Sequence, residues 1–98
     1  MQVALNTPDQ FFDFLRSSGL RKKYGLENLA LFGSFARREP FQDIDILVEE
    51  NADWKVLEDF RNEFTLLTGI KLDIMMRQFA DPLVLKYALQ DICYDTKA

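Results

Sequence analysis

Residues 29–49 have the sequence LALFGSFARREPFQDIDILVE, and this stretch decides how the rest of the chain must fold. The continuously apolar residues 29–32 predict a strand that is buried on both faces. Apolar and other side chains alternate over residues 44–49, so we expect a second strand with one face in the core and one face that holds acids. Between the two strands, residues 35–39 predict a short helix or turn, which Pro40 prevents from continuing.

The remaining segments predict helices and a third strand. Thr7-Pro8 and Asp81-Pro82 are each typical of a helix start. Apolar residues recur at three- and four-residue steps between residues 57 and 67, which predicts another helix, and residues 70–75 resemble a third strand. The link between the first two strands is too short for a parallel crossover. We therefore expect one α/β (α+β) domain over residues 1–98, a small mixed β-sheet flanked by about four helices.

The composition excludes several classes of function. The chain has 98 residues, a formal net charge of −4, one cysteine and no histidine. Without histidine, a His-based general base, a Ser-His-Asp triad and most zinc sites are excluded, which leaves carboxylates for the chemistry. The negative charge argues against long nucleic acids and anionic membranes as partners, whereas a compact anion such as Mg·ATP is compatible with it. A lone cysteine and the lack of a bilayer-length apolar run lead us to expect a soluble, cytoplasmic protein.

Gly33 and Ser34 follow the first predicted strand directly. Gly33 allows the backbone to turn sharply and to approach a ligand closely, because it has no Cβ. Ser34 offers an amide and a hydroxyl at the start of a helical turn, where free amides attract phosphate oxygens. The pair is a candidate triphosphate site, and an ordinary turn is the alternative, since both residues are common in turns.

Asp43 and Asp45 stand two residues apart on the second predicted strand, so their carboxylates share one face at a spacing of about 6.6 Å. Such carboxylates suit Mg²⁺, which usually combines one or two of them with substrate phosphates. The alternative is a pair of solvated acids on an exposed sheet face. Asp73 in the third strand weakens that alternative, because three gathered like charges would repel one another without a metal. A two-metal site for phosphoryl or nucleotidyl transfer needs such a cluster.

Together these motifs resemble the signature of the minimal nucleotidyltransferase (MNT) family in the DNA polymerase β superfamily. The similarity runs through GSFAR at residues 33–37, DIDILV at residues 43–48 and KLDI at residues 71–74. The resemblance implies that Gly33 and Ser34 hold the triphosphate of ATP. It also implies that Asp43 and Asp45 bind two Mg²⁺ ions, while Asp73 completes one metal site and helps to activate the acceptor hydroxyl.

The loop between the two motifs departs from the family pattern. The family usually has glycine after the motif arginine and a longer loop that ends in serine before the first acid. Here Arg38 and Gln42 take those positions, and the loop is shorter. Arg37 has two interpretations: it meets a phosphate through charge-assisted hydrogen bonds, or it pairs with Glu39 or Glu49.

Larger members of the family have a second domain that binds the acceptor, and the elements predicted here leave no residues for a deep acceptor pocket. We therefore expect another protein to present the acceptor. MNT proteins of this size resemble the antitoxin partners of helical HEPN-domain toxins, and some family members transfer AMP from ATP to a tyrosine of that partner. A binding module that neutralises its partner by contact is the alternative. An RNA-tailing enzyme is a third interpretation, which the acidic charge disfavours, and the oligomeric state, including a homo-oligomer, stays open.

Overall fold

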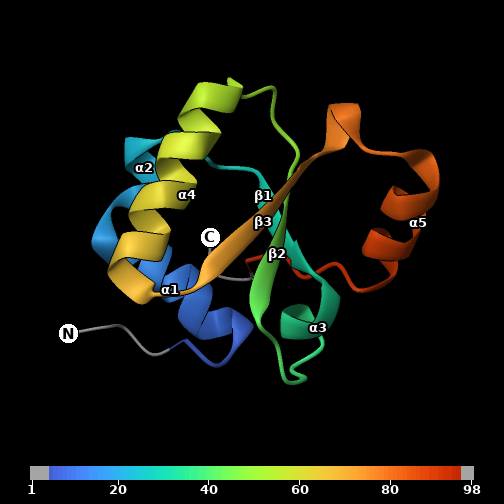
Figure 1. Ribbon diagram of the computed structural model, residues 1–98, viewed down its shortest axis with the longest axis horizontal. Helices are drawn as coiled ribbons and strands as arrows, with labels where there is room; N and C mark the ends of the chain where they lie inside the picture. Colours follow the sequence, from blue (N-terminus) through green and yellow to red (C-terminus); the bar gives the residue numbers. More distant parts are fainter. Residues whose placement is uncertain (1–4, 96–98) are drawn as a thin grey trace.

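The computed structural model describes residues 5–95 of the chain (Figure 1). In this range the elements follow in the order α1 (Pro8–Ser18), α2 (Leu20–Lys23), β1 (Leu29–Phe32), α3 (Gly33–Ala36), β2 (Asp43–Val48), α4 (Trp54–Thr68), β3 (Lys71–Met76), the 3-10 turn η1 (Arg77–Phe79) and α5 (Pro82–Gln90). The predicted α/β class is confirmed. The described residues form five α-helices around a three-stranded sheet.

The sheet has the order β1-β2-β3 and is mixed, as the short first connection predicts. β1 and β2 are antiparallel, and β2 and β3 are parallel, with α4 as the crossover between them. A further isolated bridge joins Leu31 and Cys93, which exchange two backbone hydrogen bonds of 2.8 Å. That bridge lies on the outer side of β1, so β3 forms the opposite edge of the sheet.

The core lies on one face of the sheet, between the strands and the helices α1, α2 and α4 (Figure 1). Phe11 from α1 and Phe64 from α4 meet at a ring-centroid distance of 5.6 Å. Ile44 and Ile46 of β2 are fully buried against this aromatic layer, as the alternation in the sequence predicts. The aspartates of β2 therefore lie on the other face, on the side where α5 is found.

Side-chain caps start three of the helices. Thr7 accepts a hydrogen bond of 3.3 Å from the amide of Gln10 at α1, and Asp81 accepts one of 2.9 Å from the amide of Leu83 at α5. Asp53 caps α4 through the amide of Lys55 at 2.8 Å. Because these residues satisfy amides that have no partner inside the helix, they fix where each helix begins.

Two details of the predicted stretch differ from the structure. The short helix spans Gly33–Ala36 and not residues 35–39, and it ends before Pro40 has any effect. The reason is that Arg38 adopts a left-handed conformation with φ 62°, which stops the helix. In addition, Leu47 is fully buried although it shares a face with the aspartates, so that face is only partly open.

No helix within residues 5–95 is long and apolar enough to cross a membrane.

Candidate active site

The backbone register brings two of the predicted acids side by side. Asp45 in the central strand lies opposite Asp73 of β3 on one side and opposite Phe32 of β1 on the other. Asp43 stands two residues earlier and lies opposite Lys71. Because side chains two residues apart on a strand share a face, the three acids all lie on the face away from the core.

Gly33 lies directly against the Asp45 carboxylate. A Cβ built on Gly33 would be 2.3 Å from Oδ2 of Asp45, a distance that real Cβ atoms essentially never show. Its φ of 75° lies in the left-handed region that favours glycine. The Gly33 backbone therefore lies against the Asp45 carboxylate, while the close approach of a ligand to Gly33 stays a prediction.

The electrostatic environment of Asp45 disfavours its charge. Partial burial raises the pKa of the Asp45 carboxyl, the negative charges of Asp73 and Asp43 raise it further, and a hydrogen bond with Asp73 acts in the same direction. The cation of Arg37 opposes this shift by lowering the pKa. A group in this state is stabilised by any added positive charge, whether a proton or a metal ion.

The two adjoining carboxylates fit a hard divalent cation as part of its ligand set. Within residues 5–95, no three histidine, cysteine or acidic side chains are arranged so as to hold a metal ion among themselves. Asp45 and Asp73 are direct neighbours on adjacent strands, while the exposed Asp43 acts on Asp45 through its charge. Mg²⁺ commonly takes one or two carboxylates and completes its shell with phosphates and water. The donor chemistry and the excess negative charge therefore agree with a Mg²⁺ site completed by a phosphate ligand.

Ser34 lies in the first turn of α3, half-buried and next to Gly33. The loop that follows is short but anchored. Phe41 packs edge-on against the buried Phe35 at a ring-centroid distance of 4.6 Å, and the Glu39 amide donates to the Ser34 carbonyl at 3.0 Å. These contacts hold the shortened loop in place in front of β2.

Arg37 pairs with two acids. Its Nε lies 3.1 Å from Oε2 of Glu39, and its Nη1 donates to Oδ2 of Asp91 at 2.6 Å. Both hydrogen bonds raise the pKa of the guanidinium. The Glu39 pairing was one of the predicted options, and the Glu49 pairing was wrong, because Glu49 binds Arg77 instead.

Asp91 was not found by reasoning on the sequence. It follows α5 and lies 54 residues from Arg37 in the chain, so no local pattern connects the two. Their contact ties the end of α5 to α3, next to the acids.

Comparisons with known proteins agree with this geometry. The model of the nucleotidyltransferase domain family matches residues 17–95. Two proteins of Methanocaldococcus jannaschii are similar to the chain. "Putative protein adenylyltransferase MJ0128" is 33% identical over 92% of this chain and 99% of its own length. "Putative protein adenylyltransferase MJ1217" is 34% identical over 76% of this chain and 82% of its own length.

A solved structure has the same fold. It is described as "Structure of putative minimal nucleotidyltransferase", superposes with a TM-score of 0.63 at 21% identity, and covers 85% of this chain and 94% of the other. The family match includes Gly33 and Ser34 as well as all three acids. The chain therefore belongs to the nucleotidyltransferase domain family.

Proposed function

We propose that this nucleotidyltransferase is Mg²⁺-dependent and transfers AMP from ATP to a hydroxyl group on a partner protein. The observation that supports the site most strongly is the cross-strand pairing of Asp45 with Asp73 beside the backbone of Gly33. It brings two carboxylates and a close-approach glycine together from three separate elements. Two like charges placed side by side repel each other, and such groupings cluster at functional sites.

The proposed roles follow the arrangement of the residues. Gly33 and Ser34 bind the triphosphate, with Arg37 beside them as a further phosphate contact. Asp43, Asp45 and Asp73 provide the carboxylates that hold Mg²⁺. When bound, two Mg²⁺ ions supply the charge neutralisation that phosphates need beside three acids.

The reaction moves one group between two oxygens. The acceptor oxygen forms a bond with the α-phosphorus of ATP, and the bond from that phosphorus to the bridging oxygen of the β-phosphate breaks. Pyrophosphate leaves with the bonding electron pair, and the hydroxyl proton passes to the carboxylate of Asp73 and then to water. Positioning and charge stabilisation provide the rate enhancement, since histidine is not available as a general base.

A protein acceptor is supported by the names of the two relatives, which describe protein adenylyltransferases. We further propose that the acceptor is the HEPN-type toxin of a toxin–antitoxin pair in which this chain is the antitoxin. This part of the proposal depends on the resemblance to MNT proteins of similar size.

The proposal is tested by incubating the chain with the product of the neighbouring gene, Mg²⁺ and ATP labelled at the α-phosphate. We expect label on the neighbour, loss of labelling with EDTA, and at least a 100-fold lower rate for Asp45→Asn. Asp59→Asn is the matched control, because Asp59 is an exposed acid on α4 that pairs with Lys55. Equal labelling by Asp45→Asn and the wild type would refute the proposed site.

A binding module without catalysis is the second candidate, and α5 favours it. Leu83, Val84 and Tyr87 are 60%, 52% and 60% exposed, which is an unusual apolar surface for so small a protein. The two candidates differ in their response to nucleotide. A ligand that binds only the folded state raises the melting temperature, so an unchanged melting curve in millimolar Mg·ATP would favour the binding module.

A further inference from the structure

The outer edge of β3 is open. β3 pairs with β2 through all six of its residues, and no other strand within residues 5–95 pairs with it. The edge of a sheet presents backbone N–H and C=O groups that can pair with a strand from another chain. Proteins usually cover or disrupt such an edge, so an open one beside a candidate active site calls for an occupant.

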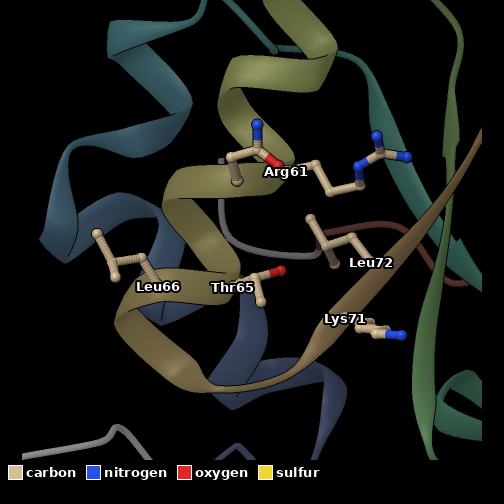
Figure 2. A pocket seen from close by; sticks show the side chains of 6 residues that line it. Arg61, Thr65, Leu66, Lys71 and Leu72 are labelled. Atoms are coloured by element: carbon tan, nitrogen blue, oxygen red, sulfur yellow. The ribbon is translucent and has the colours of Figure 1, made fainter.

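Two grooves line this edge, one at each end. The first has a volume of about 540 Å³ and lies between α4 and the start of β3 (Figure 2). Its walls are formed by Arg61, Asn62, Thr65, Leu66, Lys71 and Leu72. The second has a volume of about 350 Å³ and lies at the end of β3. Its walls are formed by Trp54, Ile74, Met75, Met76, Phe79 and Ala80.

The two grooves differ in character. In Figure 2 Arg61 extends from α4 above Leu72, and neither Arg61 nor Lys71 has an ion-pair partner among the described residues. Lys71 stands opposite Asp43 on the face of the acids, so Arg61 is the residue that gives the α4 side of this groove its positive charge. The second groove has exposed aromatic rings instead, with Phe79 78% and Trp54 50% exposed. One end of the edge therefore suits an acidic side chain and the other an apolar one.

The edge also adjoins the acids. The register places Phe32, Asp45 and Asp73 in one row across the sheet, and Asp73 ends that row at the open edge. The next position in the row belongs to whatever strand is added to β3. A side chain there shares the face of Asp73, with its Cβ about 5 Å from the Cβ of Asp73.

We propose that the acceptor protein binds as an extra β-strand on the outer edge of β3, with its acceptor hydroxyl opposite Asp73. This inference rests on the proposed nucleotidyl transfer and specifies how that reaction obtains its acceptor. Backbone pairing fixes the register of the added strand against β3. The alternation of its side chains then places one hydroxyl residue on the face of the acids.

The same alternation defines the preferred segment. The neighbours of the hydroxyl residue point to the α4 side, where the two grooves are. An acidic neighbour enters the groove with Arg61, and an apolar neighbour enters the groove with Trp54 and Phe79. The acceptor is thus an extended segment in which a hydroxyl residue stands between an acidic and an apolar residue.

Blocked seven-residue peptides provide the probe. The peptides TVEYLVT and its reverse, TVLYEVT, cover the two possible strand directions. Replacing tyrosine with phenylalanine gives a peptide that can bind but cannot accept AMP at that position. Placing proline on both sides of the tyrosine gives a peptide that cannot pair as a strand. Each peptide is added to the ¹⁵N-labelled protein with Mg²⁺ and ATP. Backbone amide shifts and hydrogen-exchange protection are then recorded over residues 71–76, and AMP transfer is measured.

We expect one of the two peptides to shift the backbone amide signals of residues 71–76 and to protect these amides from exchange. Its phenylalanine form should have both effects, and its proline form should have neither. Shifts confined to α5, or no protection of residues 71–76 by either direction, would overturn the proposal. So would a dimer in which these amides are already protected without peptide, since the occupant would then be a second copy.

Variants test the grooves separately. Arg61→Glu and Phe79→Lys are each expected to lower kcat/KM for the tyrosine peptide at least tenfold, while the rise in melting temperature with Mg·ATP is unchanged. A peptide with lysine in place of glutamate should recover transfer by Arg61→Glu, which a merely structural defect would not allow. Lys22→Glu and Leu67→Lys are the matched controls, because both residues are exposed and lie outside the two grooves.

The two proposals fail in different ways. If Mg·ATP stabilises the protein and Arg61→Glu and Phe79→Lys transfer AMP as well as the wild type, the strand proposal is wrong and the proposed function stands. If Mg·ATP has no effect but peptide protects residues 71–76, the function is wrong and the strand site stands.

Discussion

Gly33 and Asp45 are so close that a single methyl group does not fit between them. A Cβ at Gly33 would overlap Oδ2 of Asp45, and the residue already has a left-handed backbone. The turn after β1 thus depends on the carboxylate in β2, and this contact joins the two halves of the sequence motif.

This contact predicts that Gly33→Ala destabilises the protein by about 3 kcal/mol, from backbone strain and overpacking combined. Gly19→Ala is the matched control, because Gly19 has φ 78° and nothing within 4 Å of the added Cβ. It should cost about 1 kcal/mol, the backbone strain alone. Urea unfolding of both variants measures the difference, and equal losses would show that the Asp45 contact has no energetic effect.

Asp45→Asn should raise the melting temperature of the protein without ligand. The pKa of Asp45 is raised in the folded state, so folding favours its protonated form. Its contribution to stability is complete below the unfolded pKa and is lost as the pH rises through the higher folded pKa. Removing the charge should therefore raise the free energy of unfolding at neutral pH by roughly 0.5 kcal/mol, after allowance for solvent screening. This corresponds to a rise in melting temperature of about 2–4 °C.

The pH dependence provides the control for that prediction. Below about pH 3, where wild-type Asp45 is itself protonated, the two melting temperatures should converge. A variant that melts at or below the wild-type temperature at pH 7 would contradict the account of this carboxylate. Asp59→Asn again serves as the matched surface substitution.

Arg38 has a left-handed backbone at a position where the family usually has glycine. Arg38→Gly should relieve the strain and raise stability by about 0.5 kcal/mol, since part of the gain is offset by the greater freedom of glycine in the unfolded chain. Arg38→Val should lose more than 1 kcal/mol, because β-branched residues tolerate this conformation poorly. Thermal melts of both variants show which melts at the higher temperature. A lower melting temperature for Arg38→Gly than for Arg38→Val would refute this prediction.

Arg37 is held by Asp91 and Glu39, and its role in phosphate binding can be separated from these pairs. Asp91→Asn should change stability by less than 1 kcal/mol, because the pair is partly exposed. It should leave the rise in melting temperature with Mg·ATP equal or larger, since it releases the guanidinium for a phosphate. Arg37→Ala should reduce that rise. If it does not, the guanidinium serves only to tie α3 to α5.

Much of the fold was predictable because its signals are local. Caps such as Asp81 and the alternation of Ile44 with Asp45 are set by near neighbours, and the short first connection alone required a mixed sheet. The left-handed backbone at Arg38 was not predictable, because arginine has no preference for it and the surrounding loop imposes it.

The candidate site also has features that the sequence predicts and features that it does not. The sequence placed Asp45 and Asp73 on strands of the same type, but their contact depends on a strand register that no local pattern fixes. The pairing of Arg37 with Asp91 and the open edge of β3 arise only when distant segments assemble. Motif residues could therefore be found from the sequence, whereas the partners and surfaces around them could not.

The most direct test of the central claim compares ATP labelled at the α-phosphate with ATP labelled at the γ-phosphate. Each is incubated with Mg²⁺, the protein and the product of the neighbouring gene, and label on protein is measured. Nucleotidyl transfer predicts that the α-label appears on the neighbour, that the γ-label leaves in pyrophosphate, and that Asp73→Asn abolishes both. Label on protein from the γ-position, or α-labelling that persists in Asp73→Asn, would contradict the account.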